Sequence, residues 1–433
     1  MRILFISNDL IAGNVAYLLK KEGHDVKLFI QDKKRRNNFD FLVDKTYNWK
    51  QELSWVGKDG LIVFDDTGYG RIQDKLRKQG YRVFGGTELG DKAENDREYG
   101  QEIFEKYGLK TVTLKDFDNM DDAVEFVKKN PKAWVIKQNE HAAKNINYVG
   151  QLNNGQDVIS VLRNYLHNQK INKNRISLHE RVEGVEIGVG RYFNGNDWVG
   201  PIEINLEHKR FLAGDLGPTT SEMGTIAWYD ENENNKLFKE VLSKLKPFLQ
   251  EIKFKGDFEI NCIVNDKEII PLEATSRFGS PIVHLHSELH VTPWGELLSA
   301  CADGKNINFR YKKGYGIVIV LAVPPFPYST FEKDNIFYGI TAFFSNLTKE
   351  EMSHVHFEEI ARDHEDENRL YISDCRGYVA YVTAVGETVE EAREIGYSIV
   401  KKIVIPKVMY RNDIGVRFIE KDQDLLKKWG YIK

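Results

Sequence analysis

The sequence predicts a multidomain protein of α/β and α+β type, and three observations support this fold class. The chain has 433 residues, which exceeds what one hydrophobic core usually supports, so about three domains are expected. Its first 88 residues alternate short apolar runs with polar helical segments, a pattern typical of a parallel sheet covered on both faces. After residue 108 strands dominate, which indicates an α+β architecture for the rest of the chain.

The N-terminal segment opens with a βαβ pattern. Residues 3–6 are an apolar strand, a helical stretch continues to Lys21, and residues 26–30 are a second strand. Two further apolar runs lie at residues 61–64 and 81–84. We therefore expect residues 1–88 to form a small doubly wound domain.

The remainder contains both element types. One helix is expected from Asp91 to Tyr107, where Gly108 ends it, and others are expected at 231–252 and 389–403. The expected strands lie at residues 133–136, 176–179, 185–189, 258–264 and 268–273, and again from about 318. We expect a central domain of residues 89–325, with a small subdomain at about 112–182, and a C-terminal mixed β domain of residues 326–433.

Composition excludes several classes of protein. Hydrophobic residues make up 41% and charged residues 29% of the chain, as in ordinary globular proteins. The formal net charge of -4 gives no reason to expect a nucleic-acid partner. No apolar run approaches the roughly 18 residues of a membrane span, and the apolar run at residues 3–6 is too short to be the core of a signal peptide. The three scattered cysteines fit a reducing cytoplasm.

The most informative local feature is a predicted β-hairpin. Residues 257–264 and 268–273 are apolar runs that flank the polar turn 265–267. If Val264 faces Glu268 across this turn, Glu259 lies opposite Glu273, with Cβ atoms about 5 Å apart. Two carboxylates so close cannot both stay ionised at low cost, so either one is protonated or a cation lies between them. Such hard oxygen ligands suit Mg²⁺.

Other interpretations of the hairpin stay open. One alternative is that the two glutamates are solvated residues at strand ends. A second is that Pro271 bends the strand and shifts the register. Beyond the hairpin, Arg277 is a candidate clamp for phosphate or carboxylate. A strand-end arginine is also often a surface ion pair.

Three ordered motifs resemble the phosphoribosylamine-glycine ligases. Residues 272–279, Leu-Glu-Ala-Thr-Ser-Arg-Phe-Gly, are similar to the family's Glu-x-Asn-x-Arg-Phe-Gly. Residues 207–210, Glu-His-Lys-Arg, and 214–224 resemble its Asp-His-Lys-Arg and Thr-Gly-Pro-Asn-Thr-Gly-Gly-Met-Gly segments. Residues 411–417, Arg-Asn-Asp-Ile-Gly-Val-Arg, resemble Arg-Lys-Asp-Ile-Gly-Trp-Arg.

The resemblance implies an ATP-grasp fold with an N-terminal pre-ATP-grasp domain. It also implies a ligase that uses ATP and Mg²⁺ or Mn²⁺ to convert glycine to glycyl phosphate and then joins it to phosphoribosylamine. The products are glycinamide ribonucleotide, ADP and phosphate, as in purine biosynthesis. Small molecules are the implied partners, and we expect a cytoplasmic monomer or homodimer.

The same resemblance assigns roles to individual residues. It implies a metal site at Glu259, Glu273 and the weaker Thr275, which replaces a family Asn. The implied catalytic residues are Arg277 and Lys137. The implied substrate contacts are Asp215, Thr219, Arg277 and Gly279, and the implied ATP contacts are Arg97, Lys137, Lys144, Glu180, Val182 and Glu186.

Two loops depart from the family pattern. Residues 138–146 replace a glycine-rich phosphate loop and contain no glycine, so backbone amides approach phosphate less easily. Residues 7–14 replace the family's Gly-Asn-Gly-Gly-Arg-Glu-His-Ala loop, which helps to hold the phosphoribosyl group. A ligase with another amine or carboxylate, or a nucleotide-binding protein without turnover, therefore remains an alternative.

Two smaller features have competing interpretations. Histidines 284, 286 and 290 are spaced so that two of them could share a metal ion on a helix, or could pack or contact a ligand. The Asp65–Gly68 turn follows a parallel strand and could bind substrate at the sheet edge, or be an ordinary turn.

Overall fold

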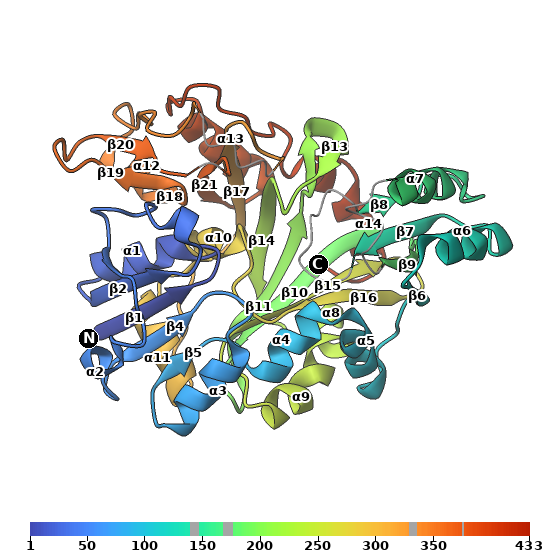
Figure 1. Ribbon diagram of the computed structural model, residues 1–433, viewed down its shortest axis with the longest axis horizontal. Helices are drawn as coiled ribbons and strands as arrows, with labels where there is room; N and C mark the ends of the chain where they lie inside the picture. The colour runs from blue at the N-terminus through green and yellow to red at the C-terminus, as the bar shows by residue number, and fades with distance from the viewer. Residues whose placement is uncertain (139–146, 168–175, 329–335, 375) are drawn as a thin grey trace.

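The computed structural model describes residues 1–138, 147–167, 176–328, 336–374 and 376–433. Figure 1 shows an N-terminal sheet on one side of a long central sheet and a small subdomain on the other. The mixed α/β and α+β architecture predicted from the sequence is confirmed. No helix in these ranges is long and apolar enough to cross a membrane.

The N-terminal sheet is parallel throughout, as the βαβ pattern predicts. Its order is β3-β2-β1-β4-β5. Successive residues of β1 enter different cores, since Ile3 and Phe5 belong to one buried cluster and Leu4 and Ile6 to another. The elements are β1 (Arg2–Ser7), α1 (Gly13–Lys21), β2 (Asp25–Ile30), β3 (Asp44–Thr46), α2 (Leu53–Val56), β4 (Leu61–Phe64), α3 (Gly70–Lys78) and β5 (Val83–Phe84).

Two helices predicted as continuous are broken, so those predictions are wrong. The first becomes α4 (Glu88–Asn95) and α5 (Arg97–Lys106), because Asp96 is extended and its side chain caps α5 by accepting from Tyr99 N. The second becomes α8 (Lys236–Glu240), a short 3₁₀ turn and α9 (Lys246–Glu251), whose first turn contains Pro247.

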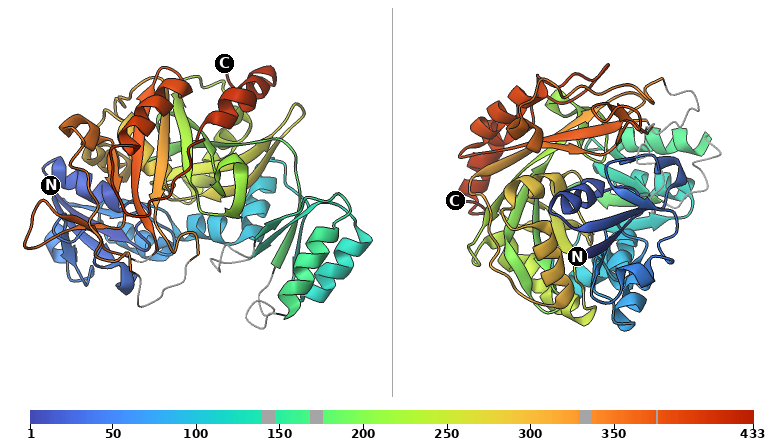
Figure 2. Two further views of the ribbon diagram at one scale, coloured as in Figure 1. Left: turned by 90° about the horizontal axis from the view of Figure 1, so that it is seen from above. Right: turned by 90° about the vertical axis from the view of Figure 1, so that its left-hand side faces the viewer.

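The small subdomain has its own four-stranded antiparallel sheet, ordered β6-β9-β7-β8, with two helices against it. Its buried side chains form a cluster separate from the main core. Figure 2 shows it standing out from the body of the molecule. Its elements are β6 (Leu114–Phe117), α6 (Met120–Lys129), β7 (Trp134–Gln138), β8 (Tyr148–Val149), α7 (Gln156–His167) and β9 (Ile176–Glu180).

The central sheet has eight antiparallel strands in the order β16-β15-β10-β11-β14-β17-β21-β18. The C-terminal segment therefore continues the sheet of the central domain. The strands are β10 (Val185–Phe193), β11 (Trp198–Glu207), β14 (Gly224–Asp230), β15 (Asp257–Val264), β16 (Ile269–Thr275), β17 (Tyr315–Ala322), β18 (Val355–Phe357) and β21 (Tyr378–Gly386).

Helices cover both faces of this sheet. Leu285 of α10 (Ile282–Leu289) packs with Val318 and Val320 of β17, whereas Ala392 of α13 (Val389–Val400) shares a cluster with Ile317. Neighbouring residues of β17 thus point to opposite layers. The remaining elements are β12 (Arg210–Leu212), β13 (Leu216–Thr219), α11 (Trp294–Asp303), α12 (Lys349–Ser353), β19 (Ile360–Arg362), β20 (Leu370–Ile372) and α14 (Gln423–Lys428).

Candidate functional site

The predicted hairpin exists, but its register differs from the prediction. Near the turn Val264 pairs with Ile269, and Glu268 belongs to the turn. Continued unchanged, that pairing would place Ala274 opposite Glu259 and turn Glu273 to the other face. A bulge beside Pro271 inserts one extra residue, so Glu273 pairs with Asn261 and Glu259 pairs with Thr275. The two glutamates are therefore diagonal neighbours on one face, not directly opposite each other.

Two glycines make room for this carboxylate group. Gly188 and Gly190 of β10 pair with Asn261 and Glu259 on one side. A Cβ at Gly188 would lie 2.6 Å from Glu259 Oε1 and 2.5 Å from Asn205 Oδ1. Polar side chains from both neighbouring strands thus lie over the β10 backbone, where a larger residue would displace them.

Glu259 has the environment of a cation ligand. Its side chain is 6% exposed, and its Oε1 has no hydrogen-bond partner in the described part of the chain. Burial and then the neighbouring charges of Glu203 and Glu207 raise the pKa of Glu259 well above its usual value. A divalent cation would compensate this concentration of negative charge.

Glu273, the second glutamate predicted to bind metal, pairs with Asn261, which the sequence analysis did not include in the site. Asn261 is 4% exposed, its Nδ2 donates to Glu207 Oε1 at 3.1 Å, and its Oδ1 has no partner among the described residues. It pairs with Glu273 and is two residues from Glu259 on the same strand, so its side chain lies on the same face as the two glutamates. With Thr275 opposite Glu259, these hard oxygen donors fit Mg²⁺ or Mn²⁺.

Cationic side chains gather beside Glu273. Lys137 Nζ lies 3.8 Å from Glu273 Oε2, and Lys209 Nζ lies 3.9 Å from Glu273 Oε1. Lys209 also contacts Glu186 at 2.6 Å and Glu207 at 2.9 Å. Burial disfavours the charge of Lys209, but Glu186, Glu207 and Glu273 together raise its pKa well above the usual value.

Arg97 joins the same group from the start of α5. It lines a small hollow with His179 and Glu273, and its charge acts on both Lys137 and His179. Burial, followed by the charges of Lys137 and Arg97, lowers the pKa of His179 to about 3, so this histidine is neutral near pH 7. The sequence prediction placed Arg97, Lys137 and Glu186 at the ATP site and Glu273 at the metal site, and the structure brings these four residues together.

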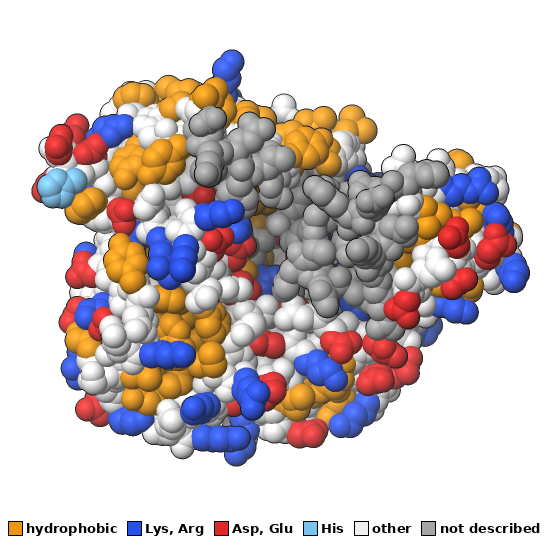
Figure 3. Space-filling view, in the orientation of Figure 1, with side chains coloured by type: hydrophobic (Ala, Val, Ile, Leu, Met, Phe, Trp, Pro, Cys, Tyr) orange, Lys and Arg blue, Asp and Glu red, His pale blue; other side chains and the backbone are white. Residues whose placement is uncertain are grey.

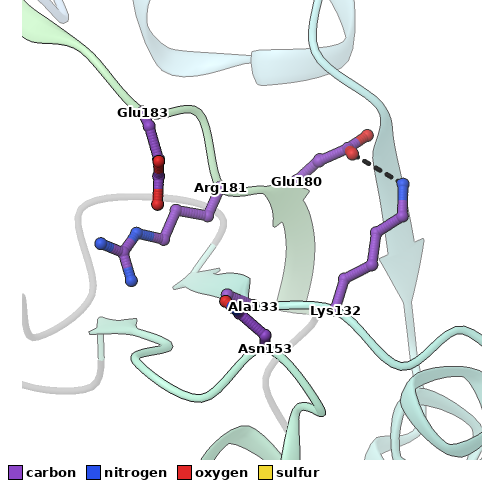
Figure 4. A pocket seen from close by; sticks show the side chains of 6 residues that line it. All are labelled: Lys132, Ala133, Asn153, Glu180, Arg181 and Glu183. Atoms are coloured by element: carbon purple, nitrogen blue, oxygen red, sulfur yellow. Dashed lines mark hydrogen bonds and ion pairs between the residues drawn. The ribbon is translucent and has the colours of Figure 1, made fainter.

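A second hollow, of about 220 Å³, lies where the small subdomain joins the central sheet (Figure 4). Glu180 lines it but is bound to Lys132 at 2.7 Å, and Arg181 donates to Gly150 O at 2.9 Å. Val182 follows directly and is half-buried. The predicted adenine hinge therefore lies along an open cavity. Lys144 lies outside the described residues.

Arg277 leaves β16 towards the N-terminal domain. Its Nε donates to Glu94 Oε1 at 2.9 Å, and the same atom lies 3.8 Å from Asp66 Oδ1. Although burial opposes the charge, Glu94 and Asp66 raise the pKa of Arg277 above its usual value. A Cβ at Gly279 would lie 3.8 Å from Glu259 Oε2, so the turn at Gly279 borders the metal face. The arginine thus forms a partly buried ion pair at the junction of two domains.

Two predicted substrate contacts lie further along the sheet. Asp215 accepts from Arg411 Nη1 at 2.8 Å and from Arg417 Nη1 at 2.9 Å. Thr219 pairs with Arg210 across the β12–β13 ribbon. In this conformation, Asp215 therefore fastens that ribbon to the C-terminal segment.

The histidine-rich helix α10 lies in the core. His286 contacts Tyr192 Oη at 3.0 Å and Glu203 Oε2 at 3.0 Å, whereas the ring of His284 stacks on Tyr381 at 4.0 Å. His290 contacts Tyr229 Oη at 2.7 Å. In the described ranges, no group of three or more His, Cys, Asp or Glu side chains is placed so that it could hold a metal ion.

The Asp65 carboxylate makes hydrogen bonds within the N-terminal domain. Asp65 is fully buried, and its Oδ2 accepts from Ser7 Oγ at 2.8 Å and Ala12 N at 3.0 Å. Burial and the neighbouring Asp66 raise the pKa of Asp65 to about 7. The loop of residues 7–14, which replaces the family's phosphoribosyl loop, is thus held by the carboxylate of Asp65 at the end of the neighbouring strand β4.

Comparisons with known proteins agree with this arrangement. Residues 95–282 match the family model of the phosphoribosylglycinamide synthetase ATP-grasp (A) domain. The chain is 24% identical over 382 residues to a phosphoribosylamine-glycine ligase of Fusobacterium nucleatum, covering 86% of this chain and 85% of the relative. It is 25% identical over 378 residues to that of Clostridium acetobutylicum, covering 84% of each.

Solved structures show the same fold. The phosphoribosylamine-glycine ligase of Thermotoga maritima superposes with a TM-score of 0.71 at 20% identity, covering 96% of this chain and all of that one. Residues 95–282 are therefore similar to an ATP-grasp domain, and the chain is similar to phosphoribosylamine-glycine ligases along most of its length. The fold is not restricted to that group. The biotin carboxylase domain of a Hydrogenobacter thermophilus 2-oxoglutarate carboxylase also matches, with a TM-score of 0.65 at 11% identity.

Two polar residues of this candidate site were missed as site residues from the sequence. Lys209 lies inside the Glu-His-Lys-Arg motif of residues 207–210, and this motif was the signal that could have found it. Asn261 could be found only with the correct register of the hairpin.

Proposed function

We propose that this chain is an ATP-dependent ligase that converts a carboxylate to an acyl phosphate and joins it to an amine. The first candidate reaction joins glycine to phosphoribosylamine to give glycinamide ribonucleotide, ADP and phosphate. The observation that carries the proposal is the face shared by Glu259, Asn261 and Glu273, beside the cations Lys137 and Lys209. The relatives named above are ligases of this kind.

The arrangement suits phosphoryl transfer. Attack of a carboxylate on a γ-phosphoryl group spreads negative charge over oxygens, and positioned cations stabilise that charge. We assign Lys137 and Arg97 to the ATP phosphates, and Glu186 and the 180–182 hinge to the nucleoside. Glu259, Glu273, Asn261 and Thr275 would hold Mg²⁺ or Mn²⁺, which when bound would offset the charge of the phosphate oxygens.

Arg277 is assigned to the reacting carboxylate. Glu94 fixes its guanidinium at the domain junction, near the Gly279 turn and the metal face. The small subdomain, about residues 112–182, would cover the nucleotide and exclude water, because an acyl phosphate hydrolyses readily.

A second candidate uses the same chemistry with a different amine. Asp65 closes the loop that in the resembling family helps to hold the phosphoribosyl group. That observation favours an acceptor without a phosphate.

A coupled phosphate-release assay tests the proposal. Release that requires ATP, a divalent metal, a carboxylate and an amine supports it, with glycine and phosphoribosylamine as the first pair. Glu273→Gln should abolish turnover and leave the fold intact. The matched control is Glu268→Gln in the same hairpin, where Glu268 pairs with Lys110 at 2.5 Å away from the metal face. Unchanged rates in Glu273→Gln would contradict the metal role.

A further inference from the structure

The glycines of β10 leave a gap in one face of the central sheet. Gly188 has Asn205 of β11 on one side and β15 on the other, so side chains of both neighbouring strands meet above it. A Cβ at Gly188 would lie 2.6 Å from Glu259 Oε1 and 2.7 Å from Asn205 Nδ2. The amide of Asn205 therefore reaches over one strand to the carboxylate of Glu259.

A hydrogen bond fixes the orientation of this amide. Asn205 Nδ2 donates to Glu203 Oε1 at 2.6 Å, and because a carboxylate oxygen is an acceptor, the nitrogen of the amide faces Glu203. Asn205 Oδ1 has no hydrogen-bond partner in the described part of the chain. Rotation of the amide would break the bond to Glu203, so the group beside Glu259 stays in one position.

Glu203 is held in turn by a side chain of α10. Its Oε2 lies 3.0 Å from His286 Nε2, and His286 Nδ1 lies 3.0 Å from Tyr192 Oη. The rings of Tyr192 and His286 also pack edge to face, with their centroids 5.8 Å apart. A chain of contacts thus runs from α10 through Glu203 to the amide of Asn205.

This chain of contacts lies in the interior of the protein. Figure 3 shows acidic and basic side chains on the wall of the hollow between the two sides of the molecule. Asn205 and His286 are each 1% exposed and Glu203 is 3% exposed, so they form no part of that surface. Because water does not compete for buried hydrogen bonds, these contacts hold the amide more firmly than surface contacts would.

Asn205 opposes the repulsion that acts on Glu259. Burial and then the charges of Glu203 and Glu207 raise the pKa of Glu259 well above its usual value, whereas the side chain of Asn205 acts in the opposite direction. A hydrogen-bond donor beside a carboxylate favours the ionised form, which is the form that binds a cation. Hydrogen bonds from a second layer of residues commonly orient metal ligands in this way.

We propose that Asn205 is a positioning residue for the metal ligand Glu259, and that Glu203 and His286 hold Asn205 in place. This inference rests on the role of Glu259 as a ligand of Mg²⁺ or Mn²⁺ in the function proposed above. The fixed amide sets the direction of the carboxylate before a cation arrives, so less conformational freedom is lost on binding.

Electron paramagnetic resonance of Mn²⁺ tests this inference on the full chain saturated with ADP. Asn205→Leu fills the same space without a hydrogen-bond donor and should weaken Mn²⁺ binding by about tenfold or more. The spectrum of bound Mn²⁺ at saturation should also change, whereas the affinity for ADP without metal should stay as in the wild type. Asn205→Ala should lose Mn²⁺ affinity in the same way, and it provides the test if the leucine variant does not fold.

Asn194→Leu is the matched control. Asn194 is also a buried asparagine, 3% exposed, and its Nδ2 donates to Asn306 Oδ1 at 2.9 Å just beyond the end of β10. This variant should keep the Mn²⁺ affinity and the Mn²⁺ spectrum of the wild type, because Asn194 has no contact with Glu259.

The variant Glu259→Gln shows whether Asn205 acts through Glu259. In that background, Asn205→Leu should weaken Mn²⁺ binding by about twofold at most, because residues that act as a unit are not additive. A further loss of about tenfold would make Asn205 a metal ligand in its own right and would overturn the positioning role.

Two other results would overturn the inference. One is wild-type Mn²⁺ affinity in both variants of Asn205. The other is an equal loss of affinity for ADP and for Mn²⁺, which indicates a role in the fold alone. Failure of the proposed function gives a different result, since Mn²⁺ binding would then be unchanged in Glu259→Gln itself.

Discussion

Replacing Glu259 by Gln keeps the size of the side chain and removes its charge. Because Glu259 is buried near Glu203 and Glu207, the change relieves repulsion in the protein without ligands. The metal loses a carboxylate at the same time. We therefore expect the variant without ligands to be at least as stable as the wild type without ligands. Its turnover rate should fall by about 100-fold or more, as when one preorganised electrostatic group is lost.

The size of the thermal signal follows from linkage. Ligand at 100 times its dissociation constant stabilises a protein by about 2.7 kcal/mol. With about 2.1 cal/mol/K of unfolding entropy per residue, a chain of 433 residues shifts by roughly 1 °C per kcal/mol. The wild type should thus gain about 3 °C from ATP and Mg²⁺ in excess, and Glu259→Gln should gain almost nothing.

Differential scanning fluorimetry at pH 8 and the phosphate-release assay provide the two measurements. Glu268→Gln is the control and should behave as the wild type in both. The reasoning is refuted if Glu259→Gln keeps the full shift and turns over within twofold of the wild type. Loss of stability in the variant without ligands would refute the assignment of Glu259 as an electrostatically strained group.

Three further changes have expected outcomes. Lys137→Gln should raise the KM for ATP about tenfold or more, because a cation 3.8 Å from Glu273 leaves the phosphate site; initial rates against ATP concentration measure this, and an unchanged KM contradicts it. Arg35→Met should lower the free energy of unfolding by about 3–5 kcal/mol, because the carboxylate partners of Arg35 stay buried without a compensating charge. Urea denaturation measures this loss, and a loss below about 1 kcal/mol would contradict a stabilising role for these buried ion pairs. Burial raises the pKa of Glu358 to about 7, so the folded state holds a proton that the unfolded state releases near 4.5. Its contribution to stability is therefore complete below pH 4.5 and is lost as the pH rises through 7, by roughly 3 kcal/mol at most; Glu358→Gln should flatten this part of the urea-stability profile, and an unchanged slope between pH 5 and 7 would exclude the effect.

Short-range patterns predicted the N-terminal sheet well. Residues 3–6 and 61–64 are continuous apolar runs, and residues 26–30 are apolar except for Lys27, because both faces of a parallel sheet are buried. The central hairpin was recognisable for a related reason, since two apolar runs flank a polar turn. Elements of this kind depend on residues within a few positions of each other, so a sequence contains the information.

Helix boundaries were less accessible. The predicted helix at Asp91–Tyr107 has a helical composition throughout, and only the capping geometry of Asp96 divides it. The division places Arg97 at the first position of α5, beside His179 and Glu273. A local break thus creates part of the candidate site.

The amino-acid sequence by itself determined the main strands of the N-terminal sheet and that two glutamates lie near each other in one hairpin. The tertiary structure decided the face on which they meet, because a single bulged residue beside Pro271 reverses the direction of every side chain beyond it. It also decided which charges surround them. Lys137, Glu203 and Glu207 lie far from the hairpin along the chain, and electrostatic interactions depend on distances in space, which only the packing of separate segments establishes.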